Sequence, residues 1–289
     1  ELYHFHRDSA EDNFKMANKL TNRKGKTMTR SIGISWGCFG GLSTDEQIGL
    51  MKENGFTATF TGSENRNLIE IMPALRAAGI TCDNYHAPFD GINHIWRAGE
   101  DGDRMAERLY ESVRTCVRYG VPALVVHLSS GMTPPHVNDV GHERWAKLME
   151  LADREGIVIC FENQRMLSNL AYAFETFPTA RFCWDVGHEA CFTHGRRYMP
   201  LFEDKLSALH IHDNHAVFNE DEHMIPGDGS IDFASAARQI AASGYRGTIM
   251  LELIRRNSDL YADWTPERYY RHAAEAARRI ADAVRAAEE

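Results

Sequence analysis

The feature that most constrains this chain is a regular alternation of short apolar runs with helical segments that end at glycine. Between residues 30 and 289 eight such apolar runs occur, and five of the helical segments between and after them end at glycine. Short apolar strands separated by helices indicate a parallel sheet that is covered on both faces. Eight such units predict an α/β protein with the (β/α)8 barrel, or TIM-barrel, fold. The expected strands are residues 31–36, 56–60, 80–86, 123–127, 157–162, 181–185, 206–212 and 248–253.

Local signals support the helical segments between these strands. Ser43 and Glu46 have the spacing of a capping box, and Gly55 ends the helix that follows. A doubly wound open sheet is the alternative arrangement, but Gly37–Gly41 lacks the spacing of a dinucleotide-binding turn. The expected helices are residues 44–54, 68–78, 104–119, 142–154, 167–175, 232–242 and 266–287, with a long loop at 88–102 and a short helical piece near 200–204.

The barrel pattern covers residues 30–289, which are predicted to form a single catalytic domain. Residues 1–29 are expected to be a separate N-terminal extension, either helical, with Ser9 as its cap, or artificially added upstream of Met28. No stretch is apolar and long enough to cross a membrane. The first residues lack the apolar region of a secretory signal, and the six cysteines are scattered singly, so the prediction is a reduced, cytoplasmic setting.

Polar side chains end six successive predicted strands, from the third to the eighth. Carboxyl ends of barrel strands meet at one rim, where active sites lie. Carboxylates gathered at one place repel each other unless a cation lies among them, so the pattern predicts a bound divalent metal. Mixed carboxylate and imidazole donors suit Mn²⁺, Zn²⁺, Co²⁺ or Fe²⁺ better than Ca²⁺. The strand-end residues are His86, His127, Glu162, Asp185, His210 and Glu252, with His188 shortly after Asp185.

The richest stretch for metal chemistry is residues 208–233. Its first part alternates Leu209 and Ile211 with His210 and His212, as in a strand, so the two imidazoles share one face. A histidine inside an apolar strand needs polar partners when it is buried. The same stretch continues to Asp221 and His223, which are further candidate ligands.

Taken in order, these motifs resemble the xylose isomerase-like TIM-barrel superfamily, which includes sugar epimerases, inosose dehydratases and abasic-site endonucleases of the endonuclease IV type. The resemblance covers residues 30–289. Single-metal epimerases of this group take their ligands from strands five to eight, which implies Glu162, Asp185, His210 and Glu252 here. The His-x-x-Asp motif of the family selects His210 over His212 as the ligand.

The resemblance implies an isomerase or epimerase that acts on a sugar or sugar phosphate. A divalent metal, Mn²⁺ or Zn²⁺ with Co²⁺ or Mg²⁺ as alternatives, would stabilise an enediolate while Glu162 and Glu252 transfer the proton. The expected substrate contacts are His86, His127, His188, His212 and Trp36, with Phe89 and Trp96 also in loops on this rim. Family relatives also allow a homo-oligomer.

Three alternatives remain open at this point. An endonuclease IV-like zinc phosphodiesterase would need additional metal ligands, for which His188, Asp221 and His223 are candidates. However, the net charge is −9, no basic run lies near the rim, and Gln-Arg-Met-Leu follows Asn163 where those nucleases carry a Gly-rich turn. Nucleic acid is therefore not the expected partner. The other two alternatives are an inosose dehydratase-like lyase and a barrel that binds a sugar without turning it over.

Overall fold

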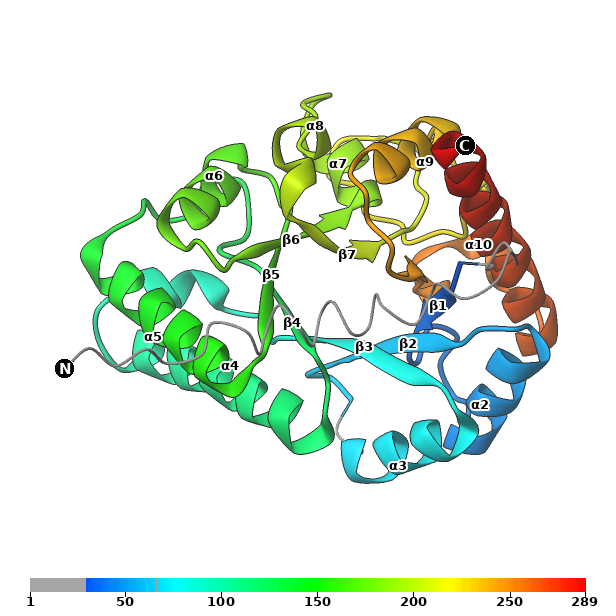
Figure 1. Cartoon of the computed structure of the whole chain (residues 1–289), viewed down its shortest axis with the longest axis horizontal. Coiled ribbons are helices and arrows are strands. Elements are labelled where there is room, and N and C mark those ends of the chain that lie inside the picture. Colours follow the sequence, from blue (N-terminus) through cyan, green and yellow to red (C-terminus); the bar gives the residue numbers. More distant parts are fainter. Residues whose placement is uncertain (1–29, 66) are drawn as a thin grey trace.

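A computed structural model describes residues 30–65 and 67–289, so the helix expected near Ser9 lies outside the described residues. The described chain forms eight parallel strands that alternate with helices, which confirms the predicted (β/α)8 barrel (Figure 1). The strands are β1 (Ile32–Ser35), β2 (Ala58–Gly62), β3 (Thr81–His86), β4 (Ala123–Val126), β5 (Val158–Glu162), β6 (Arg181–Asp185), β7 (Leu206–His210) and β8 (Ile249–Leu251).

The strands form one sheet in the order β7-β6-β5-β4-β3-β2-β1-β8. The two ends of this sheet meet through Ile211, which directly follows β7. Its N–H donates to Met250 O at 2.9 Å, and its carbonyl accepts from Glu252 N at 3.0 Å. The sheet is thereby closed into a barrel, and the first residues beyond β7 and β8 are held side by side.

The helices pack around the outside of the strands (Figure 1). Those that were predicted are found within a few residues of their expected ends, and Ser43 and Glu46 form the predicted capping box. They are α2 (Thr44–Glu53), α3 (Leu68–Ala78), α4 (Glu100–Tyr119), α5 (Asp139–Glu155), α6 (Leu167–Thr176), α8 (Met199–Phe202), α9 (Phe233–Ala242) and α10 (Pro266–Glu288).

Two local predictions were wrong. The segment 88–102 is not a continuous loop, because it contains the short 3₁₀ helix η1 (Ile92–Trp96) and the start of α4. The segment after β6 forms a helix, α7 (Val186–Phe192), that the sequence analysis missed. Asp185 starts α7, because its carboxylate accepts a hydrogen bond from His188 N at 2.6 Å.

The strands bury both of their faces, and the two faces carry different side chains. Outward residues such as Phe161, Phe182 and Trp184 join the main hydrophobic core beneath the helices. Inside the barrel the middle level is small and apolar, and it includes Val125, Cys160, Cys183 and Ala208. Because successive side chains alternate in direction, the next inward positions above these residues lie at the carboxyl ends of the strands.

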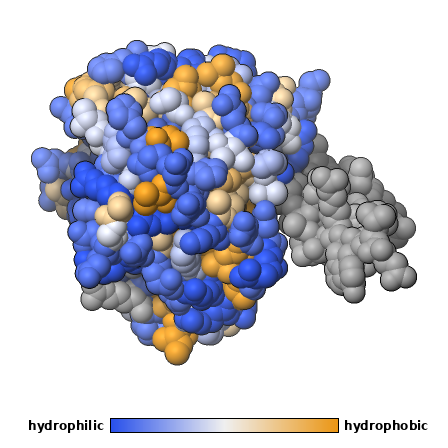
Figure 2. All heavy atoms as spheres, turned by 90° about the vertical axis from the view of Figure 1, so that its left-hand side faces the viewer, coloured by the Kyte–Doolittle hydropathy of each residue, from blue (hydrophilic) through white to orange (hydrophobic). Residues whose placement is uncertain are grey.

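The outer surface around α4 and α5 is mainly hydrophilic, with hydrophobic residues in separate spots (Figure 2). This distribution is expected for helices that turn one apolar face to the barrel and the other face to water. Among the described residues, no helix combines the length and the apolar character that a membrane span requires.

Candidate metal centre

Strand periodicity brings the predicted ligands into one layer. On β5 the inward series Val158, Cys160 and Glu162 ends in a carboxylate, and on β6 the residue two after Cys183 is Asp185. In the sheet register Asp185 pairs with His210. The strands therefore place Glu162, Asp185 and His210 at the same end of the barrel by backbone geometry alone.

Glu162 is the centre of the first group of side chains. Its side chain is fully enclosed, and the residue is 2% exposed. His210 Nδ1 lies 2.6 Å from Glu162 Oε1, His86 Nε2 lies 3.4 Å from Oε2, and His127 Nε2 is also hydrogen-bonded to Oε2. Three imidazoles from β3, β7 and the end of β4 thus surround a single carboxylate.

Glu252, which directly follows β8, completes this group. Its Oε2 lies 3.3 Å from His210 Nδ1, so His210 stands between two carboxylates. Donor atoms of His86, Glu162, His210 and Glu252 all lie within 4.8 Å of one another. His210 itself is completely buried, with its ring stacked on Phe60 at a centroid distance of 4.5 Å.

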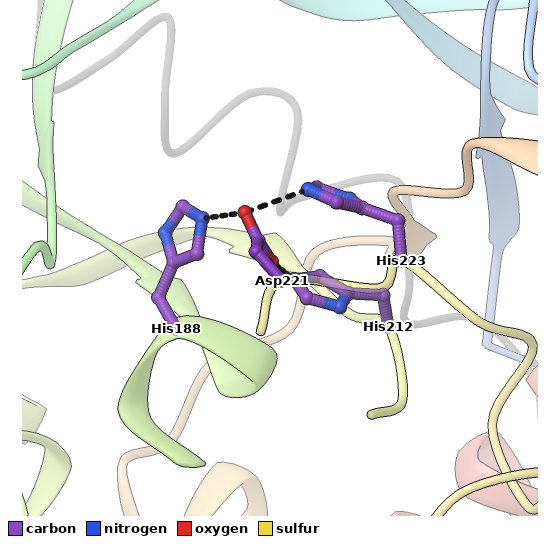
Figure 3. Close-up of side chains that lie close together, drawn as sticks. All are labelled: His188, His212, Asp221 and His223. Atoms are coloured by element: carbon purple, nitrogen blue, oxygen red, sulfur yellow. Dashed lines mark hydrogen bonds and ion pairs between the residues drawn. The ribbon is translucent and has the colours of Figure 1, made fainter. Parts of the chain in front are cut away.

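A second group consists of His188, His212, Asp221 and His223 (Figure 3). Asp221 Oδ2 accepts from both His188 Nε2 at 3.3 Å and His223 Nε2 at 3.2 Å. His212 lies beneath them, with its ring stacked on His223 at 4.0 Å between centroids and its Nε2 3.5 Å from Asp221 Oδ1. His188, His212, Asp221 and His223 therefore form a compact cluster of their own.

Asp185 joins the two groups. Its Oδ1 lies 3.2 Å from His212 Nε2, and its Oδ2 lies 3.6 Å from His188 Nδ1. One carboxylate oxygen of Asp185 lies within 4.8 Å of donor atoms of Glu162 and His188. An oxygen of Asp185 also lies within 4.8 Å of donor atoms of His212 and Glu252. The structure therefore brings Glu162, His210 and Glu252 together directly, while Asp185 stands at the border with the second group.

The electrostatics of the first group favour ionised carboxylates. Burial opposes the charge on Glu162, but the adjacent His210 and His127 outweigh burial and hold the pKa of Glu162 well below its usual value. Burial also opposes the charge on Glu252, and His210 again reverses the balance and lowers the pKa of Glu252. For His127, burial prevails and lowers the pKa. Both glutamates are thus held as carboxylates, the form that binds cations or accepts protons.

The second group pairs its imidazoles with Asp221. Burial opposes protonation of His223, but Asp221 outweighs it and raises the pKa of His223 to about 9. Burial likewise opposes protonation of His188, while Asp185 and Asp221 raise its pKa well above the usual value. Asp221 responds in the opposite direction, because His188 and His223 overcome its burial and lower its pKa. The group attracts positive charge strongly, whether the charge is carried by protons or by a cation.

The predicted substrate contacts lie in two kinds of environment. The four histidines lie in the two groups of side chains and are buried, namely His86, His127, His188 and His212. Trp36 is 8% exposed and lies within the main hydrophobic core. Their roles as substrate contacts stay predictions.

The two other aromatic residues named for this rim differ in exposure. Trp96 is buried and donates its indole N–H to Leu128 O, which is a loop-packing role. Phe89 is 51% exposed and stacks on His127 at 4.8 Å between ring centroids. Phe89 is therefore the aromatic side chain that is both open to solvent and in contact with the site.

Three supporting residues were missed by the sequence analysis. Gln164 places its amide nitrogen 3.2 Å from His127 Nε2 and 3.1 Å from His188 Nδ1, which links the two groups. Asn163 holds the backbone of Asp185 through two hydrogen bonds of 2.8 Å. Asp213 accepts backbone N–H bonds from four residues of the loop between β7 and α9, namely Asn214, Gly227, Gly229 and Ile231. The polar Glu-Asn-Gln run directly after a buried strand was the available signal for Asn163 and Gln164.

The donors in the first group fit a divalent metal. Glu252 Oε2 and Asp185 Oδ2 are buried carboxylate oxygens with no hydrogen-bond partner among the described residues. Buried polar atoms are normally paired, so these unpaired oxygens indicate a missing partner. Three carboxylates and one imidazole form a hard to borderline donor set, which suits Mn²⁺, Zn²⁺, Co²⁺ or Fe²⁺.

Comparison with known proteins identifies the family. The model of the xylose isomerase-like TIM-barrel family matches residues 49–282, so the chain belongs to that family. Among curated proteins, a stretch of 71 residues is 35% identical to an uncharacterized protein, y4fM, of Sinorhizobium fredii (strain NBRC 101917 / NGR234). That stretch spans 24% of this chain and only 22% of the relative's length.

Several solved structures share the complete fold. A D-psicose 3-epimerase from Clostridium cellulolyticum H10 superimposes with a TM-score of 0.70 and 14% sequence identity, over 90% of this chain and 99% of the epimerase. A D-tagatose 3-epimerase-like protein gives 0.69 with 17% identity over 89% and 98% of the two chains. An L-ribulose 3-epimerase gives 0.66 with 16% identity over 90% and 96%. At these identities the likeness establishes the fold.

Proposed function

We propose that this protein is a divalent-metal-dependent isomerase or epimerase that acts on a keto sugar or a sugar phosphate. The observation that carries the proposal is the convergence of Glu162, His210 and Glu252, with Asp185 adjacent, at the carboxyl end of a closed barrel. The chain also has the same fold as the 3-epimerases described above. Active sites of this barrel lie at that end.

In this proposal Glu162, Asp185, His210 and Glu252 hold the metal, which is Mn²⁺ or Zn²⁺. When bound, the metal supplies a Lewis acid that acidifies the C–H beside the sugar carbonyl and stabilises the negative charge of the enediolate. His210 lies between the two glutamates, so one imidazole fixes the positions of both carboxylates. Asn163 fixes the backbone of Asp185.

Glu162 and Glu252 carry the proton transfer. Both are carboxylates at neutral pH, because His210 lowers their pKa values against the effect of burial. They approach His210 from two different strands, so they flank a common space. One removes the proton from the sugar carbon and the other returns it. Return to the opposite face of the same carbon inverts its configuration, whereas return to the adjacent carbon moves the carbonyl.

The surrounding side chains orient the sugar. In this proposal the sugar lies against His86 and His127, which contact Glu162, and against His188 of α7. Phe89 covers His127 and provides an exposed aromatic face on which the apolar side of a sugar ring or chain can pack. This mixture of one aromatic surface and several polar groups is typical of small-molecule sites.

The test is product formation from a panel of ketopentoses and ketohexoses, with and without phosphate, followed by NMR. The panel includes D-psicose, D-tagatose and L-ribulose, and the enzyme is loaded with Mn²⁺ or Zn²⁺. We expect an epimer or an aldose from at least one sugar. A dehydrated product would instead identify a lyase. Tight sugar binding without any product would identify a binding protein and contradict the proposal.

One observation favours an endonuclease-like centre as the second candidate. His86 and His127 both reach Glu162, and Asp221 joins His188 with His223, so the extra donors that such nucleases use are grouped here as well. Against this, the chain carries a formal net charge of −9. Cleavage of an oligonucleotide that contains one abasic site, at physiological salt, would establish the nuclease.

A cytoplasmic location and a homo-oligomer stay predictions.

A further inference from the structure

We propose that the amino end of the barrel is a second binding site, which takes a small neutral molecule with an apolar body and one hydrogen-bond donor. The site is a cavity of about 450 Å³, here called the amino-end cavity. Residues at the starts of five strands line it, namely Ser31, Ala123, Val158, Leu206 and Thr248. It therefore lies at the end of the barrel opposite the candidate metal centre. The proposal goes beyond the proposed sugar chemistry and does not depend on it.

The cavity exists because short side chains face this part of the barrel. Barrel interiors are usually filled by layers of bulky branched side chains. Here the lining includes Ala123, Ser207, Ala208 and Gly247, which leave space unfilled. Ala208 belongs to the small apolar middle level, which lies between the cavity and the metal centre. The volume is within the range of about 300–1,000 Å³ that is typical of small-molecule pockets.

One polar side chain in the lining has an unused hydrogen-bonding atom. Asn84 is 3% exposed, and its Oδ1 has no hydrogen-bond partner among the described residues. Asn84 comes two residues before His86 on β3, so both side chains face the barrel interior. The amide turns about its last torsion at little cost and can present its oxygen to a molecule in the cavity. Buried amide oxygens are normally paired, so a ligand with an N–H or O–H group supplies the missing partner.

Other polar side chains of the lining already have partners within the protein. Asp83 Oδ2 accepts from Thr248 Oγ1 at 2.5 Å, although β1 and β2 lie between their strands in the sheet. Asp83 Oδ1 accepts from Thr81 Oγ1 at 2.7 Å, and Tyr245 donates its hydroxyl to Thr248 O at 3.1 Å. These bonds shape the cavity without a ligand. Because both oxygens of Asp83 are engaged and burial of a further charge is costly, the site favours a neutral molecule.

The remaining walls define the body of the ligand. Val158, Ala208 and Met250 present apolar atoms to the cavity, and an apolar surface that covers them leaves water. A cavity of about 150 Å³ is enough to hold benzene, so the amino-end cavity has room for a bicyclic molecule. Indole combines a bicyclic apolar body with one N–H donor. Benzothiophene has nearly the same shape but no donor, so the two compounds form a matched pair of probes.

The experiment titrates the chain of residues 1–289 with indole and with benzothiophene by isothermal titration calorimetry. Wild type is compared with Asn84→Leu, which removes the amide at nearly constant volume, and with Ala123→Leu, which fills part of the cavity. The matched control is Thr59→Val on the neighbouring strand β2. Thr59 is also fully buried and polar, but it lies outside the cavity lining and its hydroxyl donates to Ile34 O at 2.7 Å. Circular dichroism verifies the fold of each variant.

We expect wild type and Thr59→Val to bind indole about five- to tenfold more tightly than benzothiophene, which is the factor that one hydrogen bond contributes. Asn84→Leu should bind the two probes equally, and Ala123→Leu should bind both more weakly than wild type. The Tm of Asn84→Leu should rise, because an apolar group replaces an unpaired polar one. The Tm of Thr59→Val should fall, because a paired hydroxyl is lost and its partner is left unsatisfied.

Three results would overturn the proposal. The first is a folded wild-type protein that binds neither probe. The second is an indole affinity that is the same in wild type, Asn84→Leu and Ala123→Leu, because the probe would then bind elsewhere. The third is a lower Tm in Asn84→Leu together with an unchanged preference for indole, which would show that Asn84 serves the structure, for example through a buried water.

Discussion

Replacement of Glu162 by glutamine is the perturbation for which the structure gives the most definite expectation. The side chain keeps its shape and one carbonyl oxygen but loses its negative charge. In the native site that charge lies 2.6 Å from His210 Nδ1 and also accepts a hydrogen bond from His127. In the proposed mechanism, Glu162→Gln therefore removes a metal ligand and a proton acceptor in one step.

The expected magnitudes for activity and stability are very different. A positioned general base contributes about 10²–10⁴-fold to rate, and loss of charge on a ligand also weakens the metal, so we expect activity to fall at least ~10³-fold. A hydrogen bond to a charged group contributes about 1.5–3 kcal/mol to stability, and glutamine retains part of it. The free energy of unfolding should therefore fall by only about 1–3 kcal/mol, and Tm by roughly 2–4 °C per kcal/mol.

The assay measures the rate of solvent deuterium exchange into the keto sugar that wild type accepts, together with Tm by calorimetry. Glu189→Gln is the matched control, because Glu189 is also nearly buried but pairs with Arg197 and Trp184 rather than with the metal centre. The control should lose stability and keep its exchange rate. A folded Glu162→Gln enzyme with more than about a tenth of wild-type exchange would remove Glu162 from the mechanism.

Three further predictions concern the surroundings of the site. Asp213→Asn should lower the free energy of unfolding, measured by urea titration, by about 3–6 kcal/mol. The reason is that an amide cannot accept all four backbone N–H bonds that the carboxylate accepts. A change below about 1 kcal/mol would show that these bonds do not hold the loop. Phe89→Ala should raise KM roughly two- to tenfold with little change in kcat, because it removes an exposed ring that stacks on His127; an unchanged KM would place the substrate elsewhere. Burial raises the pKa values of Cys38 and Cys160 to about 12, so these two thiols stay protonated below that pH and should not react with a disulfide reagent between pH 7 and 9. Rapid labelling of either cysteine in the folded protein would contradict its burial.

Sequence periodicity was sufficient to predict the fold and the layer of the barrel in which the candidate ligands gather. Strands have a period of two, so Cys160 below and Glu162 above follow directly from the sequence once the strand is recognised. The same argument placed Asp185 and His210, and the structure pairs these two residues in the register of β6 and β7. Helix ends were also predictable where a capping box or a closing glycine is present, as at Ser43.

The sequence was less informative where tertiary contacts decide the structure. The helix after Asp185 has few residues and ordinary composition, and it forms because the Asp185 carboxylate accepts the His188 N–H. The direction of His212 depends on Gly187, which is distant in sequence and packs against the imidazole. The resemblance already set His188, Asp221 and His223 apart as additional donors, but no local pattern indicated that His212 would join them, because that depends on how the loop carrying Asp221 folds back. Residues 1–29 lie outside the described chain.

The central claim is that this barrel transfers a proton on a keto sugar with the help of a divalent metal. Its most direct test is the incorporation of solvent deuterium into keto sugars by the wild-type protein, metal-loaded and metal-stripped, in D₂O. We predict exchange at one carbon beside the carbonyl of at least one sugar, which is lost on chelation and restored by Mn²⁺ or Zn²⁺. The absence of exchange into every sugar tested, by a folded protein that retains its metal, would contradict the claim.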